Sequence, residues 1–413
     1  MAVTVEPLDG DLKRQSPVVW QQIEINAIRY NQAASFTLTL PANDRNWNLI
    51  AFGEGGGFLP VPIAIDWNGV LTFSGLAQQW GYTLATDDET GLVTETITLT
   101  GQDWLALLAS RIVYRDADAA WTSQTAGSTT LTDTAETLIK TLVTSTLVES
   151  ADTDRNVPNL TVATDQERGG TVSYQVISPQ PTSETDVQAT LGDTLMDMIR
   201  KVAAQSNIGV KIDLIDDGLV FDCFVPRDLT ETVVFSRYLG NLRGAQLGDT
   251  TPAANVALIQ SGATSGAFTS AHSGAGWDDP WRRAEVWVDQ SSTTDATQIT
   301  QAGRDALAEG AGQTQLQVTT VDTPRLRFGA DDTDSHIQGY AVGDKVSVEL
   351  REGVVYSDVI SQVALTADTT GDTYVETVTP TVGAADDSSA DDDTAQAALA
   401  AQVRTLQKKL KGA

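Results

Sequence analysis

"TGQDWLALLASRIVYRD", residues 100–116, predicts the most compact element of a chain that otherwise reads as strands and turns. Thr100 and Asp103 have the spacing of a capping box, in which each side chain accepts a hydrogen bond from the backbone of the other residue. "TETITLT", residues 94–100, alternates like a strand directly before it. The sequence therefore predicts a strand that gives way to a short helix at Thr100.

The predicted helix carries one apolar stripe and one late cation. Trp104 and Leu108 lie at helical spacing with the neighbouring leucines, and we expect them to pack against the open end of the preceding β-domain. Arg111 follows near the end of the helix, where a cation complements the carbonyl end of the helix dipole. The pattern favours a packing helix over a helix that binds another molecule.

Residues 1–101 read as half-buried antiparallel strands. "WQQIEINAIRYNQAASFTLTLP", residues 20–41, has apolar residues at alternate positions until its final proline. Asn68-Gly69 in "WNGV" is the strongest short signal for a β-hairpin. A second hairpin is predicted with its turn at Glu89 to Gly91.

Part of this pattern returns near the other end of the chain. "NGVLTFSGLAQQ" followed by "TETITLTG" corresponds to "EGVVYSDVISQ" followed by "VETVTPTVG". Gly69 to Gly101 spans 32 positions, and Gly353 to Gly383 spans 30. Thr- and Val-rich strands can also resemble one another by chance. The shared order and spacing favour a repeat, and therefore two similar β-barrel-like domains.

The segment between the two β-regions predicts a small α+β domain. "TAETLIKTLVTSTLV" (residues 134–148) and "TLGDTLMDMIRKVAAQSNIG" (residues 190–209) read as amphipathic helices. "GVKIDLIDDGLVFDCFVP" (residues 209–226) reads as a hairpin that turns on Asp217-Gly218. Helices followed by a hairpin are typical of an α+β insertion.

Strands resume after Phe235. "SGATSGAFTSAHSGAGW", residues 261–277, is rich in Gly, Ser and Ala and predicts an exposed loop. "RRAEVWVDQ" predicts a strand, and "DATQITQAGRDALAEGA", residues 295–311, predicts a helix that ends at glycine.

The composition excludes several classes of function. The 413 residues include 55 acidic and 26 basic side chains, for a formal net charge of -29. Such acidity argues against a surface that binds nucleic acid or anionic lipid, because both need clustered Lys and Arg. The charge is either a general property of the host's proteins or a feature that the function uses.

The single cysteine and the hydropathy pattern are consistent with a chain that folds without disulfides or membrane insertion. Cys223 lies among apolar residues in "GLVFDCFVP" and reads as a small core residue. No apolar run is long enough to span a bilayer, and the N-terminus lacks the apolar core of a secretion signal. We therefore expect no membrane span.

The C-terminal tail predicts an acidic linker and a short coil. "AADDSSADDD", residues 384–393, contains five aspartates and no basic residue. The following segment has apolar residues at spacings of four, three and four, which is a heptad seam of only two heptads. The seam predicts self-association, although docking on the body of its own chain and fraying stay open. Its residues are Leu399, Val403, Leu406 and Leu410.

A search for reactive groups predicts no catalytic, cofactor-binding or metal-ligating residue. The two histidines, His272 and His336, have no second histidine at ligand spacing. "DDTDSH", residues 331–336, and the acidic linker lack the ordered carboxylates and glycine of a calcium loop. With 55 carboxylates in the chain, a pair that hydrolyses glycans stays open as an alternative.

A series of motifs resembles the tail hub proteins of long-tailed phages, also called baseplate hub or tail-associated minor tail proteins. The resemblance is greatest to siphophages that infect actinobacteria. It covers roughly residues 15–383. The motifs, in order, are "SFTLTLP", "TLTGQDWLALLASRIVY", "LGDTLMDMIRKVAAQSNIG", "RRAEVWVD", "GYAVGDKVSVEL", "YSDVISQV" and "VETVTPTVG".

The resemblance implies a virion protein of the tail tip that is assembled in the host cytoplasm. Hubs of this family are homotrimeric rings in which two similar barrels per chain give pseudo-sixfold symmetry. The implied partners are the distal tail protein or tail tube protein, the tape measure protein, and other tail-tip or receptor-binding proteins. DNA would pass through the lumen without specific binding, and no cofactor is implied.

The predicted architecture is mainly β with an α+β insertion and a short C-terminal helix. A tail-associated glycan hydrolase and a receptor-binding β-protein are the alternative functions. The predicted domains are a first β-barrel with its closing helix (1–116), the α+β insertion (117–235), a second β-barrel (236–383), the acidic linker (384–394) and the coiled-coil-like helix (395–413).

Overall fold

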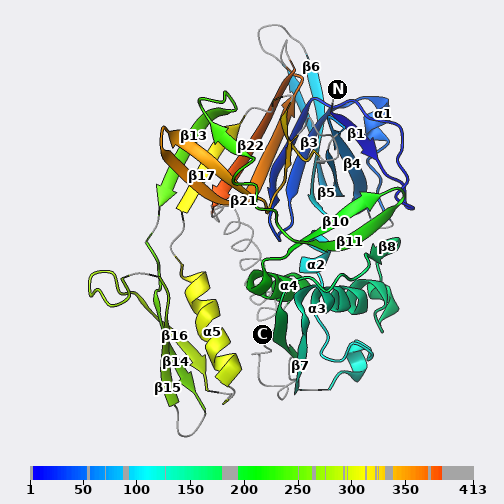
Figure 1. The fold of residues 1–413 in the computed structure, drawn as a ribbon. Helices are drawn as coiled ribbons and strands as arrows, with labels where there is room; N and C mark the ends of the chain where they lie inside the picture. Colours follow the sequence, from blue (N-terminus) through cyan, green and yellow to red (C-terminus); the bar gives the residue numbers. More distant parts are fainter. Residues whose placement is uncertain are drawn as a thin grey trace, which may run out of the picture. The chain divides into compact units, whose positions relative to one another are not determined.

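A computed structural model shows a mainly β protein (Figure 1). Among the residues described, every helix is too short or too polar to cross a lipid bilayer. The structure describes residues 3–53, 56–69, 71–86, 93–125, 127–178, 194–249, 251–262, 267–274, 276–291, 294, 296–311, 314–320, 323, 325–330, 338–370 and 374–383.

Several predicted features lie outside the described residues. They are the turn at Glu89 to Gly91, the segment 331–336 with His336, the acidic linker, and the helix that holds the self-association seam of Leu399, Val403, Leu406 and Leu410.

The chain divides into two compact units. The first comprises Met1–Gly244 and Val318–Val382, and the described part of the second lies mainly within Ala245–Gln317. The second unit therefore lies inside the sequence range that was expected to hold the second barrel.

The N-terminal module is formed by the first six strands, and it follows the predicted alternation. Side chains of β3 are buried at every second position, because successive side chains of a strand point to opposite faces. Asn68 and Gly69 have φ of 55° and 71°, so the predicted hairpin turn is confirmed. The elements are β1 (Thr4–Pro7), β2 (Gln22–Arg29), β3 (Ser35–Pro41), α1 (Asp44–Trp47), β4 (Val61–Trp67), β5 (Leu71–Thr86) and β6 (Val93–Asp103).

The helix predicted to begin at Thr100 is wrong in its start and its length. Thr100 lies inside β6, opposite Thr37 of β3, and the helix α2 is only Ala106–Ala109. β6 pairs on both sides, and these ladders satisfy the backbone groups that a helix cap would have used. The Asp103 carboxylate instead accepts a hydrogen bond from the backbone nitrogen of Leu105 at 3.1 Å.

The α+β insertion has one apolar core, formed largely by its helices and the hairpin β10–β11. Helix α4 begins with a capping box between Thr194 and Asp197, later than the predicted start at residue 190, and it ends at Asn207, with φ of 49°, close to the predicted end at residue 209. The elements are 3-10 helix η1 (Trp121–Ser123), β7 (Gly127–Thr134), α3 (Ala135–Val143), π-helix η2 (Thr144–Val148), 3-10 helix η3 (Thr153–Arg155), β8 (Leu160–Val162), β9 (Thr171–Ser178), α4 (Leu195–Ser206), β10 (Gly209–Ile215) and β11 (Gly218–Phe224).

The C-terminal module follows the insertion. Its long strand β21 begins after Gly353, whose φ of 78° is suited to a tight turn. The elements are β12 (Val234–Ser236), β13 (Leu242–Asp249), β17 (Thr314–Thr320), β18 (Leu326–Phe328), β19 (Gln338–Tyr340), β20 (Lys345–Arg351), β21 (Val354–Asp368) and β22 (Val375–Gly383).

The second unit contains a small three-stranded sheet packed on one helix, besides parts of β13 and β17. The exposed loop predicted for residues 261–277 is wrong in part, because β15 lies within it. The apolar strand β14 pairs with β15 on one side and β16 on the other, so the Gly- and Ser-rich residues supply a ladder that β14 needs. The elements are β14 (Val256–Ser261), β15 (Ala267–His272), β16 (Glu285–Gln290) and α5 (Ala296–Glu309).

The two β-regions that sequence assigned to separate barrels belong to one twelve-stranded sheet. Along the sheet, neighbouring strands run β1-β4-β5-β6-β3-β2-β21-β22-β17-β13, with β20 beside β21 and β12 beside β20. The described strands do not close into a barrel, since the path has two ends.

Candidate functional site

The sheet contains the same order of strands twice, although β1 pairs antiparallel with β4 and β12 pairs parallel with β20. The N-terminal module has the order β1-β4-β5-β6-β3-β2, and the C-terminal module has the order β12-β20-β21-β22-β17-β13. In each module the last three strands along the chain form a meander. The first strand lies beside one edge of this meander, and the third and second strands follow beside the other edge. The repeat predicted from the sequence is therefore present as a repeated strand order.

Matching irregularities fix the correspondence between the modules. The pairing of β5 with β6 shifts register between Ala77 and Gln79, and that of β21 with β22 shifts between Ile360 and Gln362. Both bulges lie near the middle of the long strand that follows the turn glycine, Gly69 or Gly353. When the bulges are aligned, Trp80 corresponds to Val363, Tyr82 to Leu365, and Leu84 to Ala367.

Strand β21 has neighbours along both edges. On the side away from β22, β20 pairs with its first half, from Val354 to Val359. β2 continues on that side and pairs antiparallel with its second half, from Gln362 to Asp368. The β2–β21 pairing therefore joins the N-terminal module to the C-terminal one.

The corresponding half of β5 has an open edge. On the side away from β6, β4 pairs with β5 only as far as Ala77. In the sheet order β5 has no neighbour other than β4 and β6 among the described strands. The backbone from Gln79 to Thr86 thus offers hydrogen-bonding groups along one side, in the place where β2 covers β21.

Side-chain burial differs in the same way between the two copies. Val363, Leu365 and Ala367 of β21 are fully buried. Their counterparts on β5 are not: Tyr82 is 40% exposed, Leu84 is 57% exposed, and Trp80 is half-buried. Large apolar side chains therefore stand at an uncovered edge.

Aromatic side chains from the β3–β4 connection extend this exposed surface. The ring of Trp47 lies 6.2 Å from that of Trp80 and 5.3 Å from that of Tyr82. The ring of Phe52, which is 53% exposed, lies 5.7 Å from that of Trp80. We call these four aromatic residues and Leu84 the rim patch. A contiguous apolar surface of this kind marks a contact with another molecule more often than a solvent-facing surface.

The opposite face of the sheet is lined by threonines. The registers place Thr37 opposite Thr100, Thr39 opposite Thr98, and Thr83 opposite Thr96. The C-terminal module repeats this arrangement with Thr366 opposite Thr377. Strands β3, β5, β6 and β22 contain no Lys or Arg, so the part of this face that these four strands form presents hydroxyl groups without cations that would hold phosphate.

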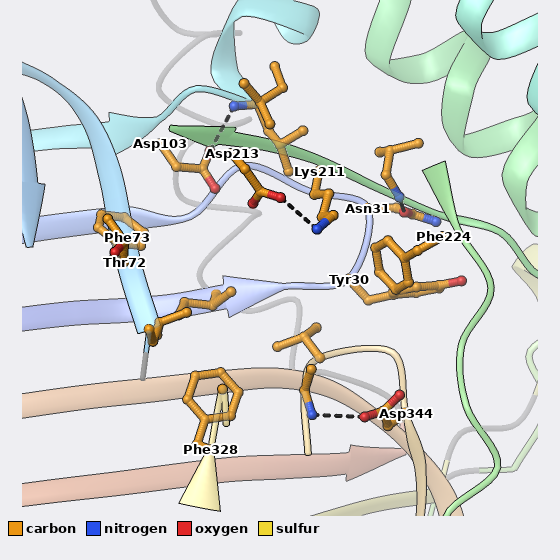
Figure 2. Close-up of a pocket in the computed structure, with 18 of the residues that line it drawn as sticks. Tyr30, Asn31, Thr72, Phe73, Asp103, Lys211, Asp213, Phe224, Phe328 and Asp344 are labelled. Carbon is orange, nitrogen blue, oxygen red and sulfur yellow. Dashed lines mark hydrogen bonds and ion pairs between the residues drawn. The ribbon is translucent and has the colours of Figure 1, made fainter. Parts of the chain in front are cut away.

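A cavity of about 450 Å³ lies where the insertion meets the two modules (Figure 2). Figure 2 shows Asp103 and the ion pair of Lys211 with Asp213 across the cavity from Phe328 and Asp344. Burial raises the pKa of the Asp103 carboxyl to about 7. The group is therefore partly protonated near neutral pH.

The polar groups around this cavity hold the first unit together. Asn31 donates from Nδ2 to the Ile208 carbonyl and accepts from the Val210 nitrogen, both at 2.9 Å. Arg227 forms an ion pair with Asp344 at 2.6 Å. These contacts tie the insertion and the C-terminal strands to neighbouring segments, which is a structural role.

A buried ionic cluster in the insertion also has a structural arrangement. Glu136, which is fully buried, forms ion pairs of 2.7 Å with both Lys140 and Arg168. Hydrogen bonds from Arg168, and then from Lys140, lower the pKa of Glu136 to about 2. Asp222 completes the cluster at 2.8 Å from Lys140. These carboxylates are neutralised by cations, unlike an acid that must donate a proton.

Metal ligands do not gather in the part of the chain that the structure describes. Groups of three or more His, Cys, Asp or Glu side chains with suitable placement are absent from those residues. His272 stacks on Trp277 with ring centroids 4.0 Å apart, and burial raises the pKa of the Cys223 thiol to about 12.

Comparison with known families decides the affiliation of the chain. The model of the Siphovirus ReqiPepy6 Gp37-like protein family matches residues 4–384. The chain belongs to this family. The resemblance to siphophage tail proteins is thereby confirmed at the level of the family, while no curated protein sequence matches the chain.

Two solved structures share the fold of this family member. One is the 43 kDa tail protein of prophage MuSo2 from Shewanella oneidensis, with a TM-score of 0.53 and 16% identity over 92% of this chain and 97% of that one. The other is the tail protein from Neisseria meningitidis MC58, with a TM-score of 0.52 and 13% identity over the same shares. The family and the fold together support a structural role in a phage tail and a place in the virion.

The residues that the sequence singled out in the α2 segment lie at the base of the sheet. Trp104 is buried, and its Nε1 donates to the Ser74 hydroxyl of β5 at 3.0 Å. Leu108 is fully buried in the apolar core that also includes the insertion's helices. The Arg111 carbonyl accepts a hydrogen bond of 2.7 Å from the nitrogen of Leu195, the first residue of α4.

Sequence reasoning missed the rim patch. Its strand residues, in "QQWGYTLAT", read as an ordinary alternating strand. The available signal was the comparison of the two repeats, which places aromatic or large residues where the other copy has Val363, Leu365 and Ala367.

Proposed function

We propose that this protein is a structural tail hub that forms a homotrimeric ring at the tail tip of a siphophage, with a host among the actinobacteria. The observation that carries the proposal is the duplicated strand order. A trimer with two equivalent modules per chain presents six similar units, which suits a neighbour built with sixfold symmetry. The distal tail protein or tail tube protein is the expected neighbour.

The threonine-lined face supports a position around a channel. A net charge of -29 repels the phosphates of DNA, and hydroxyl groups on this face offer no cation to bind them. In the proposed ring this face borders the lumen, through which the tape measure protein and then DNA pass without specific binding. Other tail-tip or receptor-binding proteins would attach outside the ring.

The proposal includes a hub without enzymatic activity. The carboxylates of the buried Glu136 and the partly exposed Asp222 are paired with cations, which supports a structural role for both residues. A cell-wall zymogram tests this point: a clearing band that one carboxylate substitution abolishes would favour the glycan hydrolase.

A receptor-binding role is the second candidate, and one observation favours it. The second unit exposes Trp281 (95%), Phe268 (72%) and Trp287 (56%), and the last two rings lie 6.4 Å apart. Exposed aromatic groups of this size are common in binding surfaces. Binding of the purified protein to host cells, lost in a Phe268→Ala and Trp287→Ala double variant, would support it.

The mass of the purified full-length chain tests the hub directly. Native mass spectrometry or light scattering should show a trimer of the 43.9 kDa chain, alone or with a tube-like neighbour present. Electron-microscopic class averages should show a ring with six similar units. A monomer under all these conditions would contradict the proposal.

A further inference from the structure

The structure contains an internal example of one module joined to the next. The edge strand β2 of the N-terminal module pairs antiparallel with the second half of β21, in the order Gln22 opposite Asp368 to Arg29 opposite Gln362. This contact completes the ladder of β21 and leaves Leu365 fully buried. This contact therefore shows that an antiparallel strand from the neighbouring module covers the edge of the second half of β21.

Each partner of that contact has a counterpart that is left uncovered. β13 corresponds to β2 in the repeated order, and it is the last strand of the sheet. The second half of β5 corresponds to the second half of β21, and it carries the rim patch. Leu247 of β13 is 41% exposed. Among the described strands, one chain thus has an edge strand without a second neighbour at one end of the repeat, β13, and an uncovered half-strand edge, on β5, at the other.

We propose that β13 of one chain pairs antiparallel with the second half of β5, Gln79 to Thr86, of a second copy of this chain. The new pairing repeats the internal β2–β21 contact, so one kind of junction joins all modules. Strand addition of this type satisfies the free backbone groups of both edges. The inference deepens the proposed function, because the ring would be closed by this junction.

The rim patch gives the partner its apolar contact. Tyr82 and Leu84 stand where Leu365 and Ala367 are buried beside β2, so we expect the incoming strand to cover them. The repeated junction joins two different surfaces of neighbouring chains. Such a head-to-tail contact gives a closed ring when the rotation from one chain to the next is a whole fraction of 360°. An open row of chains would result otherwise.

Alternation along β13 suggests which residues meet Thr83. Leu242 is buried, so Arg243, Ala245 and Leu247 lie on the opposite face if the strand alternates regularly. Thr83 corresponds to Thr366, whose partner is Glu24. Antiparallel partners have Cα atoms about 4.5–5.5 Å apart, within reach of a disulfide.

Cysteine pairs provide the test. Thr83→Cys is combined in turn with Arg243→Cys, Ala245→Cys and Leu247→Cys in the full chain, and the products are oxidised and separated on non-reducing gels. The native Cys223 is fully buried and stays unreactive. At least one pair should give cross-linked dimers and trimers. Glu24→Cys with Thr366→Cys should close within one chain, and Thr83→Cys with Ile215→Cys should give no specific product.

The outcomes separate the junction from the hub. A trimer by mass without a cross-link in any of the three pairs, while the Glu24 and Thr366 pair closes, overturns the junction and leaves the hub intact. Cross-linked chains that grow beyond three support the junction and contradict the trimeric ring. A monomer that never cross-links at high concentration contradicts both.

A substitution in the rim patch gives an independent measurement. Leu84→Lys should weaken self-association tenfold or more, because a charged side chain would have to be buried at the junction. Ile215→Lys is the matched control, since Ile215 is 52% exposed at the β10–β11 turn. Equal association of both variants and the unsubstituted chain would overturn the proposal.

Discussion

The second halves of β5 and β21 occupy the same place in two copies of one strand arrangement, yet one edge is open and the other is covered. β2 lies along β21, and the matching side of β5 has no partner among the described strands. The side chains follow the edges, because Leu365 is buried and Leu84 is exposed. Both positions hold leucine or a similar apolar residue, so hydrophobicity alone does not distinguish the two edges. The difference in the exposure of equivalent side chains shows which edge has no neighbouring strand.

The largest expected effect is on folding stability, from a substitution in the N-terminal module at a position where the two modules have different residues. A Cβ on Gly101 would lie 2.1 Å from the Leu76 carbonyl oxygen, whereas the corresponding residue of β22 is Val382. Gly101→Ala should therefore prevent folding or cost more than about 4 kcal/mol of unfolding free energy. Chemical denaturation measures the change. Gly81→Ala, with no atom within 4 Å of its new Cβ, should change stability little.

The next effect concerns the buried ionic cluster of the insertion, which lies away from both strand edges. Arg168→Met leaves the buried Glu136 with Lys140 as its remaining ion-pair partner, and it should cost about 3 kcal/mol. The pKa of Glu136 is lowered from 4.5 to about 2, so its stabilising contribution is complete above pH 4.5 and is lost as the pH falls toward 2. Denaturation between pH 2 and 7 should show this acid-dependent part shrink in the variant. An unchanged pH profile would contradict the assignment.

A pair of matched truncations sharpens the comparison itself. Leu365→Ala should lower the unfolding free energy by about 2–5 kcal/mol, because it leaves a cavity in a buried site. Leu84→Ala should change that of the dilute chain by less than about 0.5 kcal/mol, because the side chain is exposed. Similar costs for both truncations in the dilute chain would show that the two edges are equally covered.

The smallest effect concerns the cavity beside the N-terminal copy. Burial raises the pKa of Asp103 from 3.8 to about 7, so the folded state keeps a proton that the unfolded state releases. Stability should therefore fall as the pH rises from 4 to 7. Asp103→Asn should remove this slope and stabilise the protein at pH 8, where the carboxyl of the native chain is ionised. Thermal unfolding across this pH range would reveal a persisting slope if the assignment is wrong.

Local chemistry made much of the fold predictable. Alternation predicted β3, the Asn68-Gly69 dipeptide predicted the β4–β5 turn, and α4 lies within the helix predicted for residues 190–209. The helix at Thr100 failed because pairing on both sides of β6 decided its conformation. β15 failed for a similar reason, since this strand, in a Gly- and Ser-rich stretch of the sequence, takes its structure from pairing with β14.

The candidate site depended on contacts that no local pattern contains. The repeat was visible in the sequence, but the β2–β21 pairing joins residues more than 300 positions apart. Periodicity indicates that Trp80, Tyr82 and Leu84 share a face, and it gives no sign of whether a neighbour covers them. Only the three-dimensional register of both copies shows the difference.

The chain places strands β14, β15 and β16 and helix α5 between β13 and β17, where the other copy has the short link between β2 and β3. Such a site tolerates insertion, because the strands on either side keep their partners whatever is grafted between them. A scaffold of repeated modules can then remain constant while one appendage per chain diversifies. Exchange of that single cassette would change one part of the chain and leave the pairing of the repeated strands intact.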